Sequence, residues 1–200
     1  MPWDTARTRR LLFEAAIQEF SDHGRAGARV DRIAAAAGVN KERIYQYFGN
    51  KQQLFEAVLE QEMAKFAAAI PMDDELAADL GQFAAKVYDY HRTYPHYLRL
   101  LLWEGLDLST SPPTEPAAAE ERSHRYAAHI RAVARAQAAG ALRADVAPAY
   151  LLYTARSMAA WWLATPSLAD LMLGDNAADT TAARRAVLVS LVNSATRPAP

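Results

Sequence analysis

The chain has 200 residues, 52% of them hydrophobic, which is enough for one large or two small domains with a substantial core. It has no cysteine, which excludes disulfides and thiolate metal sites, and no uninterrupted apolar run of about 18 residues that could span a membrane. The polar N-terminus lacks the apolar core of a signal peptide, so we expect a cytoplasmic protein.

Charge is distributed unevenly along the chain, although the formal net charge is only −1. Residues 1–51 contain nine Lys or Arg and six Asp or Glu, whereas residues 52–200 contain thirteen and seventeen. A basic segment followed by an acidic one suits a protein that presents one end to a polyanion. The excess is small, so it supports this interpretation without deciding it.

The alanine-rich, glycine-poor composition predicts an all-α protein. We expect the first helix from about Thr5 to His23, with Leu12, Ala16 and Phe20 packing inward. Its first turn is strongly basic, which indicates either a solvated helix end or contact with a DNA backbone. The residues concerned are Arg7, Arg9 and Arg10.

Two short helices joined by a tight turn are predicted next. The first has one apolar face, formed by Val30, Ile33, Ala34 and Ala37 at spacings of three and four. Gly38 can adopt the left-handed conformation that ends a helix, and the side chain of Asn40 can cap the following one. That second helix, residues 41–47, buries Ile44 and Phe48. The pattern predicts a helix-turn-helix.

The other faces of this second helix carry basic, amide and phenol side chains that suit a DNA groove. A helix-turn-helix is a geometry before it is a function, and glycine-linked short helices also occur in all-helical proteins that bind no DNA. The turn alone therefore favours neither interpretation. If DNA is bound, the groove-facing set is Lys41, Glu42, Arg43, Tyr45, Gln46 and Tyr47.

The string IAAAAGVNKERIYQYFGNKQQLFEAVL resembles the N-terminal signature of the tetracycline-repressor (TetR) family, and the resemblance covers about residues 7–60. It implies an N-terminal helix-turn-helix head joined by a fourth helix to a C-terminal helical bundle, with about nine helices in total. It also implies that Tyr45 and Tyr47 pack against sugar–phosphate or a thymine methyl group, and that Lys51 donates to a phosphate. The matching residues are Ile33, Ala34, Ala37, Gly38, Val39, Ile44, Tyr45, Tyr47, Phe48, Lys51 and Leu54.

The chain departs from the family pattern at a few positions. Ala28 and Arg29 stand where Ser or Thr is usual, and Arg29 cannot cap a helix although it could reach a phosphate as a cation. Asn40 replaces a usual Ser, Arg43 a small residue and Gln46 a frequent His or Arg. These changes leave the operator sequence unpredictable. The expected DNA-binding residues are Arg29, Asn40, Lys41, Glu42, Arg43, Tyr45, Gln46, Tyr47 and Lys51.

A DNA-binding domain is expected over residues 1–50, and a ligand-binding and dimerisation domain over residues 51–200. Asn50 is expected to cap a helix that runs to about Ile70, before Pro71. Prolines and hydroxyl residues mark a loop at residues 107–116. Further helices are predicted over residues 76–93, 95–105, 117–139, 148–164 and 180–195, with a short helical turn near 168–173.

The second domain is rich in aromatic residues, which predict either a well-filled core or an apolar pocket with a few polar groups. The family resemblance favours the pocket and places it among the middle helices. A hydrophobic or aromatic small-molecule effector would then bind there. The residues expected to line the pocket are Phe83, Val87, His91, Trp103, Tyr126, Met158 and Trp162.

The helices at 148–164 and 180–195 are expected to form the two-fold interface of a homodimer, as the resemblance implies. A dimer would place two recognition helices in successive major grooves of double-stranded DNA. The proposed contacts are Leu151, Ala155 and Ala159 on the first helix, and Ala183, Val187 and Leu191 on the second.

No catalytic signature, phosphate-binding glycine loop or internal repeat is present. The pairs His91/His96 and His124/His129 are five residues apart rather than the four that aligns two ligands on a helix. We therefore expect no enzyme, no cofactor and no metal. The remaining alternatives are an activator, a DNA-binding protein without a ligand, and an all-α enzyme or small-molecule carrier whose helix-turn-helix is incidental.

Overall fold

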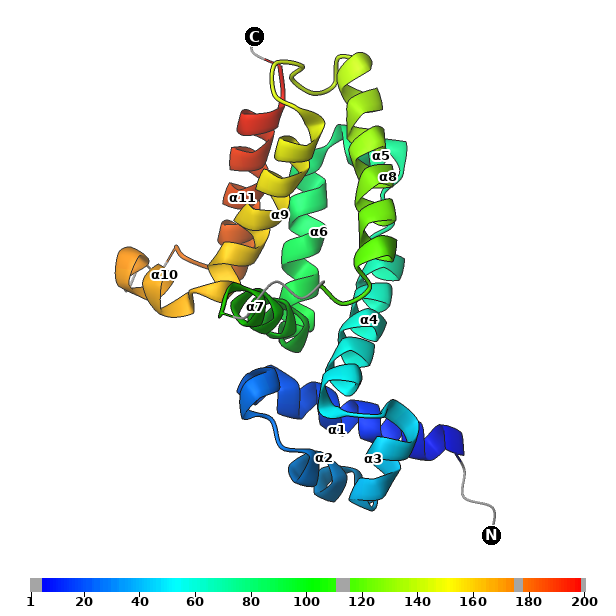
Figure 1. Ribbon diagram of the computed structural model, residues 1–200. Coiled ribbons are helices and arrows are strands. Elements are labelled where there is room, and N and C mark those ends of the chain that lie inside the picture. Colours follow the sequence, from blue (N-terminus) through cyan, green and yellow to red (C-terminus); the bar gives the residue numbers. More distant parts are fainter. Residues whose placement is uncertain (1–4, 111–115, 175–177, 199–200) are drawn as a thin grey trace. The chain divides into compact units, whose positions relative to one another are not determined.

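The computed structural model describes residues 5–110, 116–174 and 178–198 (Figure 1). Every regular element within these ranges is an α-helix, which confirms the all-α prediction. The eleven helices found there are α1 (Thr5–Gly27), α2 (Val30–Ala37), α3 (Lys41–Phe48), α4 (Lys51–Ala69), α5 (Asp74–Ala78), α6 (Leu80–Thr93), α7 (Pro95–Thr110), α8 (Ala119–Ala138), α9 (Pro148–Ala164), α10 (Pro166–Leu173) and α11 (Thr181–Thr196).

Two helix boundaries differ from the predicted ones. The expected helix at 76–93 is interrupted, because Asp73 and Asp79 each accept a backbone hydrogen bond and start separate helices. In addition, α7 continues past Gly105 to Thr110, where a loop had been predicted from residue 107. An isolated glycine costs a helix only about 1 kcal/mol and does not have to end it. Residues 111–115 of the predicted loop lie outside the described ranges.

The chain forms two compact units that interleave along the sequence. The first comprises Met1–Phe66 and His96–Ala119, and the second Ala67–Pro95 and Glu120–Pro200. These units are not the same as the expected domains 1–50 and 51–200. The division into a DNA-binding domain and a ligand-binding domain remains a functional prediction. Helix α7 therefore belongs to the same unit as the helix-turn-helix, although it follows α6 in the chain.

The first unit has a core of aromatic and aliphatic side chains from α1 to α4. The ring of Phe13 packs edge-on against Phe48 at 5.2 Å, and Phe20 packs against Phe55 at 5.1 Å. Gly24 interrupts α1 with a φ of 63°, so the regular part of this helix ends next to the predicted residue, His23. The aliphatic residues buried beside the aromatic ones are Leu12, Ala16, Ile33, Ile44 and Leu54.

The second unit is built around α6, which packs against both α9 and α11 (Figure 1). The backbone N–H of Gly81 at the start of α6 donates to the side chain of Asn193 on α11 at 3.2 Å. No helix in the described ranges is long and apolar enough to cross a membrane. The inward-facing residues of α6 include Leu80, Phe83, Ala84, Val87 and Tyr88.

Candidate functional site

The turn between α2 and α3 has the predicted local geometry. Gly38 ends α2 in the left-handed conformation, with φ 65° and ψ 31°. The side chain of Asn40 accepts a hydrogen bond from the backbone N–H of Glu42 at 3.3 Å and so caps α3. Ile44 and Phe48 are buried on the inner face of α3. These contacts fix α3 on the first unit with its other face outward.

The outward face of α3 carries most of the expected DNA-binding residues. The side chain of Tyr45 is 44% exposed, and Glu42 and Gln46 are also exposed. Arg43 donates to the side-chain oxygen of Gln46 at 3.3 Å, and both groups are polar enough to read a base edge. Lys41 lies 2.8 Å from Asp31 on α2.

Glu19 on α1 holds the start of α2 in place. Its carboxylate accepts hydrogen bonds from the backbone N–H of Arg29 at 2.8 Å and from Nε of Arg32 at 2.7 Å. Burial raises the pKa of Glu19, but the bonds from Arg32 and Arg29 outweigh it and the pKa is lowered. The side chain of Arg29 is exposed and, as expected, does not cap α2.

Lys51 makes a contact that sequence reasoning missed. Its ammonium group donates to the backbone carbonyls of Ala28 at 3.0 Å and Ala26 at 3.3 Å, at the end of α1. Tyr47, which was expected to face DNA, is half-buried and its ring lies 6.2 Å from that of Phe48. Both residues therefore support the head itself, whatever they contact in DNA.

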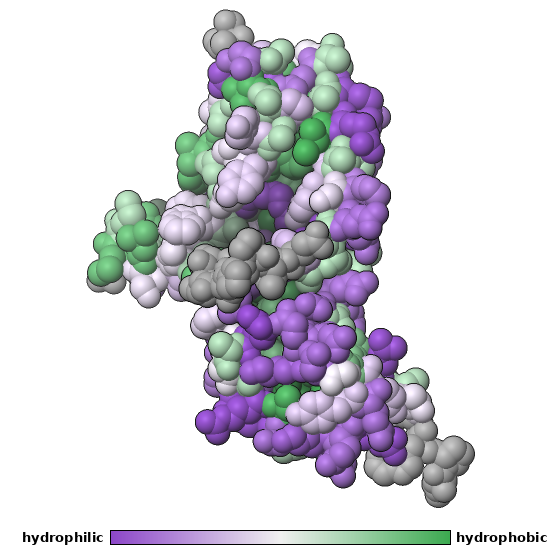
Figure 2. All heavy atoms as spheres, viewed as in Figure 1, coloured by the Kyte–Doolittle hydropathy of each residue, from purple (hydrophilic) through white to green (hydrophobic). Residues whose placement is uncertain are grey.

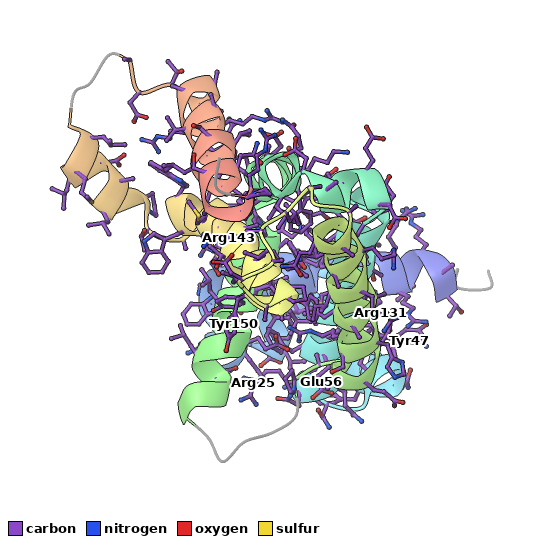
Figure 3. All side chains as sticks on the ribbon, turned by 90° about the horizontal axis from the view of Figure 1, so that it is seen from above. Arg25, Tyr47, Glu56, Arg131, Arg143 and Tyr150 are labelled. Carbon is purple, nitrogen blue, oxygen red and sulfur yellow. The ribbon has the colours of Figure 1, made fainter. Side chains whose placement is uncertain are left out.

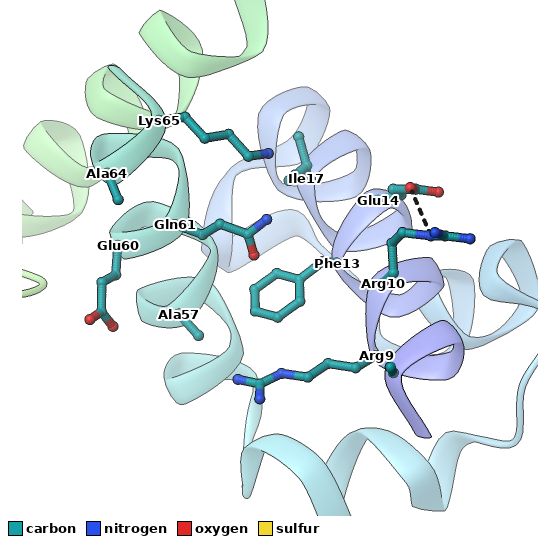
Figure 4. Close-up of a pocket in the computed structure, with 11 residues that line it drawn as sticks. Arg9, Arg10, Phe13, Glu14, Ile17, Ala57, Glu60, Gln61, Ala64 and Lys65 are labelled. Carbon is teal, nitrogen blue, oxygen red and sulfur yellow. Dashed lines mark ion pairs between the residues drawn. The ribbon is translucent and has the colours of Figure 1, made fainter. Parts of the chain in front are cut away.

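A groove of about 720 Å³ lies between α1 and α4 in the first unit and was not predicted (Figure 4). Phe13 and Ile17 of α1 face Ala57 of α4 across it, and Arg9 and Lys65 reach toward it from opposite sides. The guanidinium of Arg9 lies 5.6 Å from the ring centroid of Phe13. The groove combines an apolar floor with mixed charges.

Comparison with known proteins places these features in a family. The sequence model described as "Bacterial regulatory proteins, tetR family" matches residues 12–58, and the one described as "Tetracyclin repressor-like, C-terminal domain" matches residues 79–193. The HTH-type transcriptional repressor SCO4008 from Streptomyces coelicolor is 38% identical over 184 residues, which cover 92% of this chain and 93% of that protein. The chain belongs to the TetR family. It is a helix-turn-helix transcriptional regulator.

Three further proteins are also similar to this chain. The HTH-type transcriptional repressor NicS from Pseudomonas putida is 35% identical over 50% of this chain and 49% of that protein. The crystal structure of SCO4942 from Streptomyces coelicolor superposes with a TM-score of 0.82 at 33% identity, over 96% of this chain and 99% of the other. FadR from Bacillus subtilis, solved with stearoyl-CoA, has a TM-score of 0.70 over 93% and 98% of the two chains, but at 16% identity it shows the TetR fold alone.

The residues expected to bind an effector in this TetR-family chain are divided between the units. Phe83, Val87 and His91 are buried on α6 in the second unit. The half-buried ones there are Tyr126 on α8 and Met158 and Trp162 on α9.

Trp103, by contrast, is on α7 and belongs to the first unit. Its indole N–H donates to the carbonyl of Ser21 at 3.1 Å, and its ring occupies the space beside Gly24. It therefore has a structural contact that the sequence did not predict.

A cluster of polar side chains in the second unit includes one residue, Arg156, that the sequence analysis did not identify. The guanidinium of Arg156 on α9 lies 5.7 Å from the ring centroid of Tyr126 on α8. Burial, and then the charge of Arg156, lower the pKa of His91 to about 4. The pKa of His129 on α8 is also lowered, by burial and then by Arg156 and Arg125. The signal available in the sequence was that Arg156 is the single charged residue of the apolar segment 148–164.

The predicted dimer contacts on α9 are wrong. Leu151, Ala155 and Ala159 are at most 3% exposed, because this face of α9 packs inside its own chain. On α11, by contrast, Val187 is 47% and Leu191 50% exposed, while Ala183 is half-buried. Within the described ranges, no group of three His, Asp or Glu is placed to hold a metal ion.

Proposed function

We propose that this protein is a homodimeric repressor that binds double-stranded operator DNA in the cytoplasm. A hydrophobic or aromatic small molecule that binds the second unit would release it. The proposal includes no enzymatic reaction and no cofactor. The observation that supports it best is the capped, outward-facing α3, whose exposed Tyr45 and Gln46 and half-buried Arg43 suit a major groove.

An apolar face on α9 and α11 supports the dimer. The two helices pack side by side, as the view from above shows (Figure 3). Large hydrophobic side chains remain exposed on both: Tyr150, Tyr153 and Trp161 on α9, at 61–71%, and Val187 and Leu191 on α11. Exposed apolar surface of this kind marks an interaction site, and a two-fold axis lets one patch pair with its own copy.

Helix α10 extends this apolar surface. Leu168, Leu171 and Met172 are 45%, 84% and 76% exposed, and Figure 2 shows the hydrophobic colour gathered on the projecting α10. Because α10 follows α9 directly, we assign it to the edge of the same dimer interface.

The contacts of α7 suggest how effector binding could reach the DNA-binding head. Arg99 and Trp103 both donate to the carbonyl of Ser21, at 2.8 and 3.1 Å, and Arg25 pairs with Asp107 at 2.9 Å. Helices α4 and α7 also carry the chain between the two units. A ligand that favours a shifted position of α7 or α4 would move the head and lower DNA affinity.

The test is fluorescence anisotropy with labelled DNA from the region upstream of the chain's own coding sequence. We expect sequence-specific binding that at least one compound from a panel of hydrophobic and aromatic molecules reverses. The same compound should also raise the melting temperature. At a hundredfold excess over its Kd, binding adds about 2.7 kcal/mol to the free energy of unfolding. Specific binding that every compound leaves unchanged would contradict ligand control while leaving DNA binding intact. The alternative is an activator, which would bind the same DNA as tightly as a repressor. A reporter gene placed behind the upstream DNA would separate the two, because an activator would raise its transcription.

A further inference from the structure

Three helices of the second unit place polar side chains around one arginine. Tyr126 and His129 are three residues apart on α8, so they share a face of that helix. Arg156 lies over the ring of Tyr126, 5.7 Å from its centroid. His91, on α6, is 3% exposed and feels the charge of the same arginine.

The two histidines in this cluster are held in their neutral form. Burial and the charge of Arg156 lower the pKa of both, to about 4 for His91, and Arg125 adds to the effect on His129. They therefore contribute hydrogen-bonding groups near neutral pH without adding positive charge to that of the arginine. Nδ1 of His129 is buried and has no hydrogen-bond partner within the described ranges. Such an atom in a folded protein calls for an explanation, and a bound ligand is one.

We propose that Arg156, together with Tyr126 and His129, binds the carboxylate group of an otherwise apolar effector. This inference rests on the proposed function, because it gives the chemical class of the molecule that releases DNA. A planar guanidinium donates two parallel hydrogen bonds to a carboxylate, and a neutral histidine and a phenol each add one donor. Phe83 and Val87 lie eight and four residues before His91 on α6 and would face the apolar part.

The alternatives are less suited to this cluster. An amine would bring a second positive charge beside Arg156, and like charges in a partly buried site repel. A neutral amide could use the same donors, but its hydrogen bonds are weaker than those of an ionised carboxylate. The site should therefore rank ligands by charge: carboxylate first, amide second, amine last.

The test uses the full-length protein and three carboxylates: phenylacetate, 4-phenylbutyrate and decanoate. Each is compared with its primary amide and its matching amine. Kd is measured by tryptophan fluorescence, with the melting temperature as a second readout. We expect at least one carboxylate to bind about tenfold more tightly than its amide, and the amines not to bind. An amide that binds as tightly as its carboxylate, an amine that binds more tightly, or no binding by any probe would overturn the inference.

Variants then assign the preference to Arg156. Arg156→Gln should abolish the carboxylate-over-amide preference by weakening the binding of the carboxylate more than that of the amide, and Arg156→Lys should restore part of the preference. Arg131→Gln, at an exposed position on α8 (Figure 3), is the matched control and should behave as wild type. Thermal melts establish that each variant is folded. If Arg156→Gln keeps the full preference, the anionic group binds elsewhere.

DNA binding separates this inference from the proposed function. A protein that binds its upstream DNA and is released by a neutral or cationic compound retains the proposed function but lacks the carboxylate site. A protein that binds carboxylates but has no specific affinity for DNA retains the site but is not a repressor.

Discussion

At the scale of single residues, Lys51 stabilises the end of α1. The carbonyls in the last turn of a helix have no N–H partner in that helix, and a cation there also suits the helix dipole. Lys51 supplies both a hydrogen-bond donor and a positive charge at this point, because its ammonium group donates to the carbonyls of Ala26 and Ala28. The family resemblance had implied a phosphate contact, so the two roles need to be separated.

Replacing Lys51 with methionine should lower both stability and DNA affinity. The lost hydrogen bonds predict a decrease of about 1 kcal/mol in the free energy of unfolding, since the ammonium is partly exposed. Lys86→Met, at an exposed position on α6, is the matched control. Thermal denaturation and anisotropy check the two effects. A normal melting temperature combined with weakened DNA binding would mean that Lys51 acts only on phosphate.

His91 predicts a pH dependence of stability. Its pKa is about 4 in the folded chain and about 6.5 when unfolded, so between these values the unfolded chain binds a proton that the folded chain refuses. The free energy of unfolding therefore falls as the pH is lowered through this window and is unaffected above it. From about pH 7 to about pH 5 the loss assigned to His91 is about 2 kcal/mol.

Urea denaturation of wild type and His91→Gln at both pH values, at one protein concentration, measures this contribution. The variant should lose about 2 kcal/mol less than wild type on acidification. Equal losses in the two proteins would show that another group controls the acid sensitivity. His129, whose pKa is also lowered, contributes with the same sign in both proteins.

At the scale of helices, the kink in α1 links α7 to the DNA-binding head. Gly24 has φ 63°, a conformation that strains any residue with a side chain, and a Cβ there would lie 2.7 Å from the ring of Trp103. The kink thus lets Trp103 approach the backbone closely enough to donate to Ser21. We expect the whole α1–α7 contact to depend on this glycine.

Gly24→Ala should therefore destabilise the protein by about 2–4 kcal/mol and weaken DNA binding, from backbone strain and overpacking together. Gly105→Ala is the matched control, because a Cβ there has no neighbour within 4 Å and Gly105 lies inside α7. That control should be neutral or stabilising by up to about 1 kcal/mol. Thermal denaturation of both variants tests the prediction, and equal melting temperatures would rule out strain at Gly24.

Helices with local end signals were predictable from the sequence. Gly38, Asn40 and Pro148 mark the ends of α2, α3 and α9, and each acts through its own backbone or nearest turn. The break at Asp79 was not predictable, because an aspartate can either cap a helix or lie exposed within one.

Which face of a helix is buried was harder to predict. In α9 apolar residues occur on all sides, so periodicity could not distinguish the buried Leu151 and Ala155 from the exposed Tyr153 and Trp161. Only packing against other helices decides this. The contact of Trp103 with Ser21 on α1 was missed for the same reason, because these two residues are 82 positions apart along the chain.

At the scale of the whole molecule, the dimer is the main requirement for DNA recognition. Leu191→Glu should give a monomer without specific DNA binding, because an unpaired carboxylate in an apolar interface costs several kcal/mol. Leu102→Glu, at a 41% exposed position on α7, is the control and should remain dimeric. Light scattering measures the mass of each. A dimeric Leu191→Glu would place the interface elsewhere.

The central claim is that α3 reads DNA, and Tyr45→Ala tests it most directly. Tyr45 is 44% exposed, so its removal should leave fold and dimer intact; Tyr94→Ala, at 45% exposure in the second unit, is the control. Anisotropy at about 0.15 M salt compares upstream DNA with a scrambled duplex. We predict that Tyr45→Ala lowers affinity for the upstream DNA about tenfold or more, with wild-type affinity for the scrambled duplex. Wild-type affinity of Tyr45→Ala for the upstream DNA would contradict the account.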